Sequence, residues 1–374
     1  MVLSDRSSTS APIRALIVDD TPFMRKTVER VLGGSDLIEV VGTASNGLEC
    51  LDKIDEQRPD VITLDIDMPV MNGISAVKNI MIRHQIPIVI ISSLVQDGYF
   101  AFEALRLGVM DFVPKPSKVG PVNFANDEEL IRQRVLIAAS MQVNRVRRVR
   151  YRRRSGPGML TSLNRPSGIT VIGTTLAGPN NIMHLVSALP SNFSGAIIAI
   201  QEIHPRILVP FCACFNQISP VEVVPVVSET PLLPGRVYIG STFSSLSVEK
   251  SNSGPSGLEV RATQNGRLPI DGLFASAARH FGERTCGVLL TGIGADGAKG
   301  MEQIKAAGGV TIAQEISSCP FPNLVENAID SHMVDAVLSI GQIAHRLSAW
   351  PYNDAPEEQW DIASVVEDED FDLV

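Results

Sequence analysis

Short apolar runs alternate with amphipathic stretches through residues 13–116, a pattern that is typical of strands separated by helices. Such alternation predicts a parallel sheet with right-handed crossovers. A further helix is expected to begin with Asn126 as its N-cap and Glu129 as the capping-box partner. The strands are expected at 13–18, 38–42, 60–64, 86–92 and 110–113, and the other helices near 22–33, 46–56, 72–83 and 98–107.

The same alternation begins again at Ile169, after a stretch rich in serine, glycine and proline (155–168) that predicts a linker. Both halves are therefore expected to be α/β, each with a doubly wound parallel sheet. In the second half the strands are expected at 169–173, 196–201, 221–226, 236–240, 287–292, 309–314 and 336–340, and the helices near 179–189, 271–282, 296–307 and 322–331.

These patterns predict a chain of two domains with three connecting or terminal segments. The five parts in order are a disordered N-terminus (1–12), a first domain (13–135), an arginine-rich helix extension and linker (136–168), a second domain (169–350) and an acidic tail (351–374).

The length of 374 residues agrees with two or three domains. No apolar stretch approaches 18 residues and the first twelve residues lack a signal-peptide core, so we expect a cytoplasmic protein without membrane insertion. The five cysteines are odd in number and lie among apolar or small residues, which favours buried thiols over a disulfide framework.

The net charge of −9 resides in the tail, which holds nine acidic residues and no lysine or arginine. A basic block at 142–154 contains seven arginines in thirteen residues. It could contact phosphates or an anionic membrane, but we favour a charged interdomain helix that pairs transiently with the tail. No recognition element for DNA is visible, so no nucleic-acid partner is expected.

Chemically useful side chains occur where strands of the first half end. Asp19 and Asp20 follow the first strand, Asp65 ends the third, Ser92 ends the fourth and Lys115 follows the fifth. Parallel sheets bind ligands at this edge, and converging carboxylates repel one another unless a hard cation such as Mg²⁺ bridges them. The pattern predicts a Mg²⁺ site at which an aspartate accepts a phosphoryl group held by the lysine and the hydroxyl.

Residues 13–135, with the motifs VDD, LDIDMPVMNG and KP, resemble the response-regulator receiver domain, which has a flavodoxin-like fold. The resemblance implies Asp65 as phosphoacceptor and a chemistry that depends on Mg²⁺. It further implies Asp19 and Asp20 as metal ligands with the Asp67 carbonyl, Lys115 as the phosphate contact, and Ser92 and Phe112 as switch residues.

The stretches IGTTLAGPNNI (172–182), LTGIGADGAKGM (290–301) and GGVTIAQEISSC (308–319), together with a receiver before them, resemble the chemotaxis protein-glutamate methylesterase family, CheB. That family removes methyl groups from glutamyl esters on chemoreceptors with a Ser-His-Asp triad, and receiver phosphorylation activates it. The resemblance implies a chemotaxis-type histidine kinase and the cytoplasmic region of a chemoreceptor as partners.

Two of the three triad positions are altered in this chain. Thr175 stands at the serine position of the family's G-A-S-T-G-G turn, and Glu202 stands at the histidine position of its Q-H-M-P-P motif. Only the aspartate, Asp296, is retained. A glutamate cannot replace an imidazole that accepts one proton while donating another to the aspartate.

The favoured interpretation is a CheB-like response regulator that has lost methylesterase catalysis and signals by binding. The alternative is an active methylesterase with a rebuilt Thr175/Glu202 or Thr175/His204 site, since His204 lies two residues beyond Glu202. A third interpretation, a DNA-binding regulator, shares the receiver but lacks a helix-turn-helix candidate.

Overall fold

The computed structural model describes residues 11–92, 98–115, 121–147, 149, 166–251, 255–264 and 267–350. The first ten residues of the expected N-terminal segment, most of the expected linker and the acidic tail lie outside the described residues. Within the described ranges, every helix is too short or too polar to reach across a bilayer.

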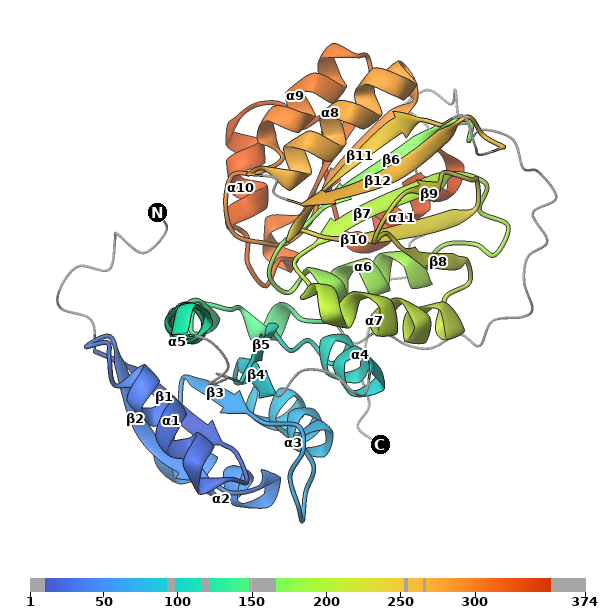
Figure 1. Cartoon of the computed structure of the whole chain (residues 1–374). Coiled ribbons are helices and arrows are strands. Elements are labelled where there is room, and N and C mark those ends of the chain that lie inside the picture. Colours follow the sequence, from blue (N-terminus) through green and yellow to red (C-terminus); the bar gives the residue numbers. More distant parts are fainter. Residues whose placement is uncertain are drawn as a thin grey trace.

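The first half forms a parallel sheet in the order β2-β1-β3-β4-β5, the flavodoxin-like order (Figure 1). Helices α1 and α5 cover one face, and α2, α3 and α4 cover the other. The elements are β1 (Ile13–Val18), α1 (Pro22–Leu32), β2 (Ile38–Ala44), α2 (Gly47–Gln57), β3 (Val61–Leu64), α3 (Gly73–Asn79), a π-helical turn (Ile80–His84), β4 (Ile88–Ser92), α4 (Gly98–Arg106), β5 (Asp111–Pro114) and α5 (Pro121–Ala138).

The second half forms a larger parallel sheet in the order β15-β14-β13-β6-β7-β10-β8, with a small antiparallel sheet, β11-β12-β9, packed near α8. The expected fold class is confirmed in both halves. The elements are β6 (Ile169–Gly173), α6 (Gly178–Ser187), β7 (Ala196–Gln201), α7 (Pro205–Ile218), β8 (Glu222–Pro225), β9 (Thr230–Pro231), β10 (Arg236–Ser241), β11 (Ser244–Lys250), β12 (Leu258–Gln264), α8 (Pro269–Phe281), β13 (Thr285–Leu289), α9 (Ala298–Ala306), β14 (Val310–Gln314), α10 (Asn323–Asp330), β15 (Ala336–Leu338) and α11 (Ile340–Ala349).

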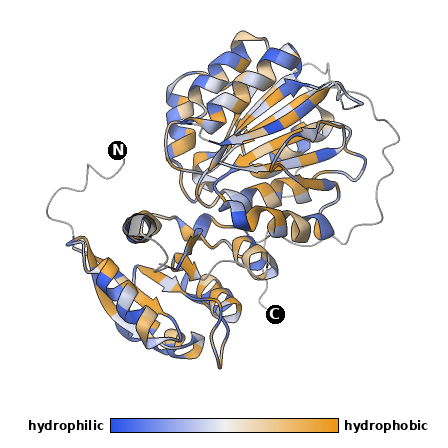
Figure 2. Ribbon diagram, in the orientation of Figure 1, coloured by the Kyte–Doolittle hydropathy of each residue, from blue (hydrophilic) through white to orange (hydrophobic). Residues whose placement is uncertain are grey.

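Burial of apolar strand residues explains why these segments pack as sheets. Most residues of β1, β3, β4, β6, β7 and β13 are buried, and Figure 2 shows hydrophobic residues along the strands of both sheets. Strands covered on both faces read as continuous apolar runs, which is why they were visible in the sequence.

Two expectations about the region after β5 are wrong. Helix α5 begins at Pro121, so Asn126 lies inside the helix and is not its N-cap. The helix ends at Ala138, and the described start of the arginine block forms only a 3₁₀ turn (Val143–Arg145) instead of a helix extension. Arg145 donates through its Nη1 atom to the carbonyl oxygens of Ile316 (3.0 Å) and Cys319 (3.1 Å), so this part of the chain is held against the second half.

The two halves pack through α4 and α7, which lie side by side in Figure 1. Phe102 of α4 lies 5.8 Å from Phe211 and 6.4 Å from Phe215 between ring centroids. All three side chains are buried. Asn180 of α6 adds a hydrogen bond of 2.9 Å from its Nδ2 atom to the carbonyl of Arg106, at the end of α4.

Candidate functional sites

Three carboxylates of the first half converge where the sequence predicts. Asp19 and Asp20 follow β1 and Asp65 follows β3, and one oxygen of each lies within 4.8 Å of the others. Asp19 and Asp65 are buried. Carboxylate oxygens at this spacing fit a hard divalent cation such as Mg²⁺, which prefers oxygen ligands.

Lys115 neutralises part of this acidic cluster. Its Nζ atom lies 2.8 Å from Asp19 Oδ2 and donates to Asp65 Oδ2 at 2.7 Å. Burial raises the pKa of Asp65, and the hydrogen bond from Lys115 opposes that rise. Burial lowers the pKa of Lys115, but its bonds to the two aspartates outweigh this and raise it overall, so the lysine stays charged.

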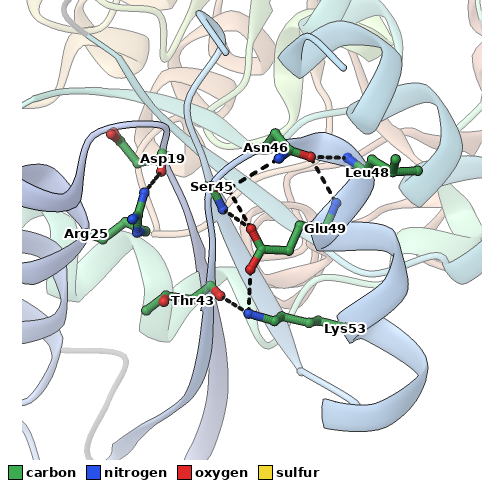
Figure 3. A network of polar contacts seen from close by, with 8 residues as sticks. All are labelled: Asp19, Arg25, Thr43, Ser45, Asn46, Leu48, Glu49 and Lys53. Atoms are coloured by element: carbon green, nitrogen blue, oxygen red, sulfur yellow. Dashed lines mark hydrogen bonds and ion pairs between the residues drawn. The ribbon is translucent and has the colours of Figure 1, made fainter. Parts of the chain in front are cut away.

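The loop after β1 is held in place by residues that the sequence did not single out. Arg25 of α1 donates to the backbone carbonyl of Asp19 at 2.6 Å (Figure 3). It also donates to the backbone carbonyl of Asp20 at 3.1 Å. Thr21 donates to Asp19 Oδ1 through its amide (2.9 Å) and its hydroxyl (2.7 Å). An arginine one turn into the helix after an acidic pair is the signal that could have identified this anchor.

The remaining receiver residues are placed as follows. Ser92 is buried at the end of β4 and pairs in register with Pro114 of β5. Phe112 of β5 is buried in the cluster that contains α4. The side chain of Asp67 is exposed, and the expected use of its carbonyl as a metal ligand stays a prediction.

In the second half, the three positions assigned to the triad line one cleft of about 290 Å³. They follow the carboxyl ends of β6, β7 and β13, where the direction of strand addition reverses and open α/β sheets bind ligands. The cleft is lined by Arg134, Thr175, Glu202, Thr242, Phe243, Arg267, Pro269 and Asp296.

Backbone groups satisfy the hydroxyl of Thr175. Its Oγ1 atom accepts from the amide of Ile293 at 2.7 Å and donates to the carbonyl of the same residue at 3.2 Å. Ala177 in the same turn has a φ of 58°, a left-handed conformation that favours glycine. Leu176 and Ala177 are buried in an apolar cluster shared with α5 of the first half.

Glu202 forms an ion pair with Arg134, which comes from α5 of the first half. The Nε atom of Arg134 also lies 2.9 Å from Asp111 Oδ2 of β5. Burial raises the pKa of Asp111 to about 7, with Arg134 opposing the rise and Glu202 adding to it. One cation therefore serves two carboxylates across the domain boundary.

Asp296 binds the start of α8. Its two carboxylate oxygens accept from the amides of Ile270 and Asp271, each at 2.9 Å. Asp271 reciprocates, since its Oδ1 atom accepts from the amides of Gly297 (2.9 Å) and Gly300 (2.7 Å) at the start of α9. Burial raises the pKa of Asp296, and these backbone hydrogen bonds lower it. The retained aspartate is a helix cap in this structure.

His204 is not among the described residues that line the cleft. It is the N-cap of α7, where its Nδ1 atom accepts from the amide of Arg206 at 3.2 Å, and its ring lies 5.9 Å from that of Phe243. The geometry does not bring it together with Thr175. Helix α7 was not expected from the sequence, because Pro210 interrupts its helical pattern.

Comparisons with known proteins identify the family. Residues 170–347 match the model described as CheB methylesterase, and residues 15–122 match the response regulator receiver domain. A protein-glutamate methylesterase/protein-glutamine glutaminase of Pyrococcus abyssi is 32% identical over 346 residues, or 90% of this chain and 92% of the relative. One of Hydrogenovibrio crunogenus is 33% identical over 370 residues, or 90% and 98%. This chain belongs to the CheB methylesterase family.

Among solved structures, the catalytic domain of Thermotoga maritima CheB is 26% identical and covers 48% of this chain and 97% of that one, with a TM-score of 0.45. The CheB architecture, a receiver followed by a methylesterase domain, runs through the chain. A receiver implies a kinase as phosphodonor. Of the cleft residues, Arg134, Thr242 and Phe243 were not singled out from the sequence, because only the fold brings them to the triad positions.

We expect Asp65→Asn to abolish incorporation of label from radioactive acetyl phosphate, and we expect chelation of Mg²⁺ to abolish it in the parent protein. The reason is the carboxylate cluster with Lys115 bonded to Asp65. Asp60→Asn is the matched control, since Asp60 lies at the opposite end of the same strand. Label retained in Asp65→Asn at the parent level would rule out Asp65 as the acceptor.

We expect Asp296→Ala to lower the free energy of unfolding by about 1–2 kcal/mol, because two amides at the start of α8 lose their acceptor. Denaturant titration of the full chain measures this change. The exposed Asp330 at the end of α10 provides the control, Asp330→Ala, with an expected change within about 0.5 kcal/mol. Equal stabilities of the two variants would contradict the capping role.

We expect the two halves to dock more tightly at pH 6 than at pH 8. Docking brings Glu202 beside Arg134 and Asp111. Burial and the nearby Glu202 both raise the pKa of Asp111, which reaches about 7. A carboxyl with a higher pKa in the docked state binds more protons there, so docking weakens as pH rises through 7. Small-angle scattering at the two pH values measures the effect, which Asp111→Asn should remove.

Proposed function

We propose that this CheB-family chain accepts phosphoryl groups on Asp65 from a chemotaxis-type histidine kinase and signals by binding, its second domain having lost methylesterase catalysis. The observation that carries the proposal is that the side chains at the two substituted triad positions, Thr175 and Glu202, are both bonded to other groups of the protein. Backbone groups engage Thr175, and an arginine from the receiver engages Glu202.

The receiver side retains the groups that phosphoryl transfer to a carboxylate needs. Asp65 is the acceptor, and its Oδ1 atom is oriented by a 2.8 Å hydrogen bond from the amide of Ile66. Asp19 and Asp20 would hold Mg²⁺ with Asp65, and the ion supplies positive charge against the incoming phosphate. Lys115, which binds Asp65, and the hydroxyl of Ser92, at the end of the neighbouring strand β4, would bind the phosphoryl oxygens.

The esterase side lacks an activated nucleophile. The relatives are named for methylester hydrolysis and glutamine deamidation, and both reactions transfer a glutamyl acyl group. Such transfer by a hydroxyl needs a base that takes its proton and an acid that returns a proton to the leaving group. A glutamate paired with Arg134 does neither well. Loss of the serine or the histidine alone lowers kcat by about 10⁶ in a comparable hydrolase.

The alternative function is an active methylesterase with a rebuilt site. The observation that favours it is that Thr175 and Glu202 line the same cleft as Asp296. Glu202 would have to leave Arg134 before it could act as a base. A Thr175/His204 pair has less support, because His204 caps α7 and lies against Phe243.

We expect no methanol release above background from a methylated chemoreceptor cytoplasmic region, with or without beryllofluoride as phosphoryl analogue. Thr175→Ser and Glu202→His should each yield little, and the double variant should yield more than the sum, because the two residues act as a unit. Thr242→Ser, at another position in the cleft, is the control for a general disturbance.

Turnover by the parent protein that Thr175→Ala abolishes would refute the loss of catalysis and support the alternative. Full activity in Thr175→Ser alone would show that Glu202 or His204 already acts as the base. Binding of the parent to the receptor region, measured on the same samples, tests the signalling role separately from turnover.

A further inference from the structure

We propose that the cleft of the second domain binds the ionised carboxylate of a glutamate side chain on a partner protein, and that Arg267 and Thr242 select this carboxylate over an uncharged ester or amide. The inference deepens the proposed function, signalling by binding, and rests on it. It assigns the chemistry of the ligand and the two residues that determine the specificity.

The polar side chains that line the cleft fall into two sets. Thr175, Glu202 and Asp296, at the triad positions, are each bonded to other groups of the protein. Among the described residues of the cleft, the guanidinium of Arg267 and the hydroxyl of Thr242 have neither a hydrogen bond nor an ion pair within the described chain. A ligand that enters the cleft therefore finds its available hydrogen-bonding groups at these two residues.

The turn that carries Thr242 is held in shape by bonds to the segment that follows β7. The amide of Thr242 donates to the carbonyl of Gln201 at 2.9 Å. The amide of Phe243 donates to Ser241 Oγ at 3.2 Å, and the hydroxyl of Ser241 donates to the carbonyl of Ile203 at 2.6 Å. Because the turn is already ordered, a ligand that binds to it loses little free energy in ordering it.

Arg267 lies directly before α8, whose start is anchored by the two hydrogen bonds to Asp296. The amide of Gly272 also donates to the carbonyl of Leu268 at 3.1 Å. The backbone that follows Arg267 is thus fixed, whereas Arg267 itself is exposed. A guanidinium binds both oxygens of a carboxylate through two parallel N–H bonds, and the negative charge makes these bonds stronger than bonds to an ester or amide.

The charges that line the cleft favour a ligand with a single negative charge. Arg134 and Arg267 bring two positive charges to the cleft. The carboxylates of Glu202 and Asp296 bring two negative ones. A glutamate adds one negative charge, whereas a phosphoryl group adds about two and meets stronger repulsion from the carboxylates already present. A carboxylate is therefore the favoured anion.

Exposed apolar side chains beside these polar groups indicate a protein ligand. Phe243, which lines the cleft, is 50% exposed, and Leu268, next to Arg267, is 49% exposed. Large apolar side chains that gather at a polar site are typical of surfaces that bind another protein. A glutamate side chain carries its carboxylate on two methylene groups, so it matches a cleft that offers both an arginine and an aromatic ring.

Fluorescence anisotropy of the full chain with labelled synthetic peptides tests the inference. The short peptides consist of alanine, serine and leucine, and they differ only at the central position, which is glutamate, glutamate γ-methyl ester, glutamine or phosphoserine. Arg267→Gln removes the guanidinium, and Thr242→Val removes the hydroxyl at nearly constant size. Arg279→Gln is the matched control, because Arg279 is an exposed arginine at the other end of α8. Thr242→Ser is a second control, since it keeps a hydroxyl.

We expect the parent to bind the glutamate peptide about tenfold more tightly than the ester or glutamine peptide, because only an ionised carboxylate forms charge-assisted hydrogen bonds with Arg267. In Arg267→Gln the affinities for these three peptides should lie within about twofold of one another, and Thr242→Val should weaken glutamate binding about threefold. Both controls should keep the preference of the parent. Circular dichroism of each variant reports whether it is folded.

Equal affinity of the parent for the glutamate and ester peptides, or no measurable binding of the glutamate peptide, would overturn the inference. A preference for glutamate that persists in folded Arg267→Gln would overturn the role of this arginine. Tighter binding of the phosphoserine peptide would identify a phosphate site instead. Release of methanol from the ester peptide, measured on the same samples, would overturn the loss of catalysis, whereas the comparison of glutamate with glutamine still decides the inference.

Discussion

One guanidinium placed between two carboxylates joins the halves of this molecule. Arg134 lies on α5 and Asp111 on β5 of the receiver, and Glu202 directly follows β7 of the second domain. The aromatic contact of α4 with α7 and the hydrogen bond from Arg145 to the carbonyl of Ile316 are further contacts between the two halves. Because charges are costly to bury unless they are paired, the arrangement of the two domains is tied to the pairing of Arg134.

The three positions assigned to the family's triad illustrate how residues can line one site while each has its own bonding partners. Thr175, Glu202 and Asp296 still line one cleft at the carboxyl ends of parallel strands. Their polar atoms bind the backbone of Ile293, the receiver's arginine and the start of α8, respectively. The sheet dictates where side chains meet, whereas the local partners decide what chemistry those side chains can perform.

Much of the fold could be predicted from hydrophobic runs, because strands buried on both faces are apolar throughout. The α7 helix escaped notice because Pro210 lies inside it. Helix α11 was also missed, although Ser339 and Gln342 form a capping box, because the expected strand at 336–340 extended into its first residue. The carboxylate cluster could be predicted because strand ends meet at one edge. The pairing of Arg134 with Glu202 could not, since 68 residues separate them and only domain docking brings them together.

The backbone of the turn that contains Ala177 is strained, and the packing that holds it in this shape depends on the receiver being docked on the second domain. A non-glycine residue in the left-handed region costs about 1–3 kcal/mol, and the surrounding packing must hold it there. Ala177 and Leu176 are packed in the cluster that includes α5 of the receiver. The receiver thus supplies part of the support for the shape of this turn. Any event that moves α5 away also frees the turn to relax, so the shape of the cleft floor depends on the position of a different domain.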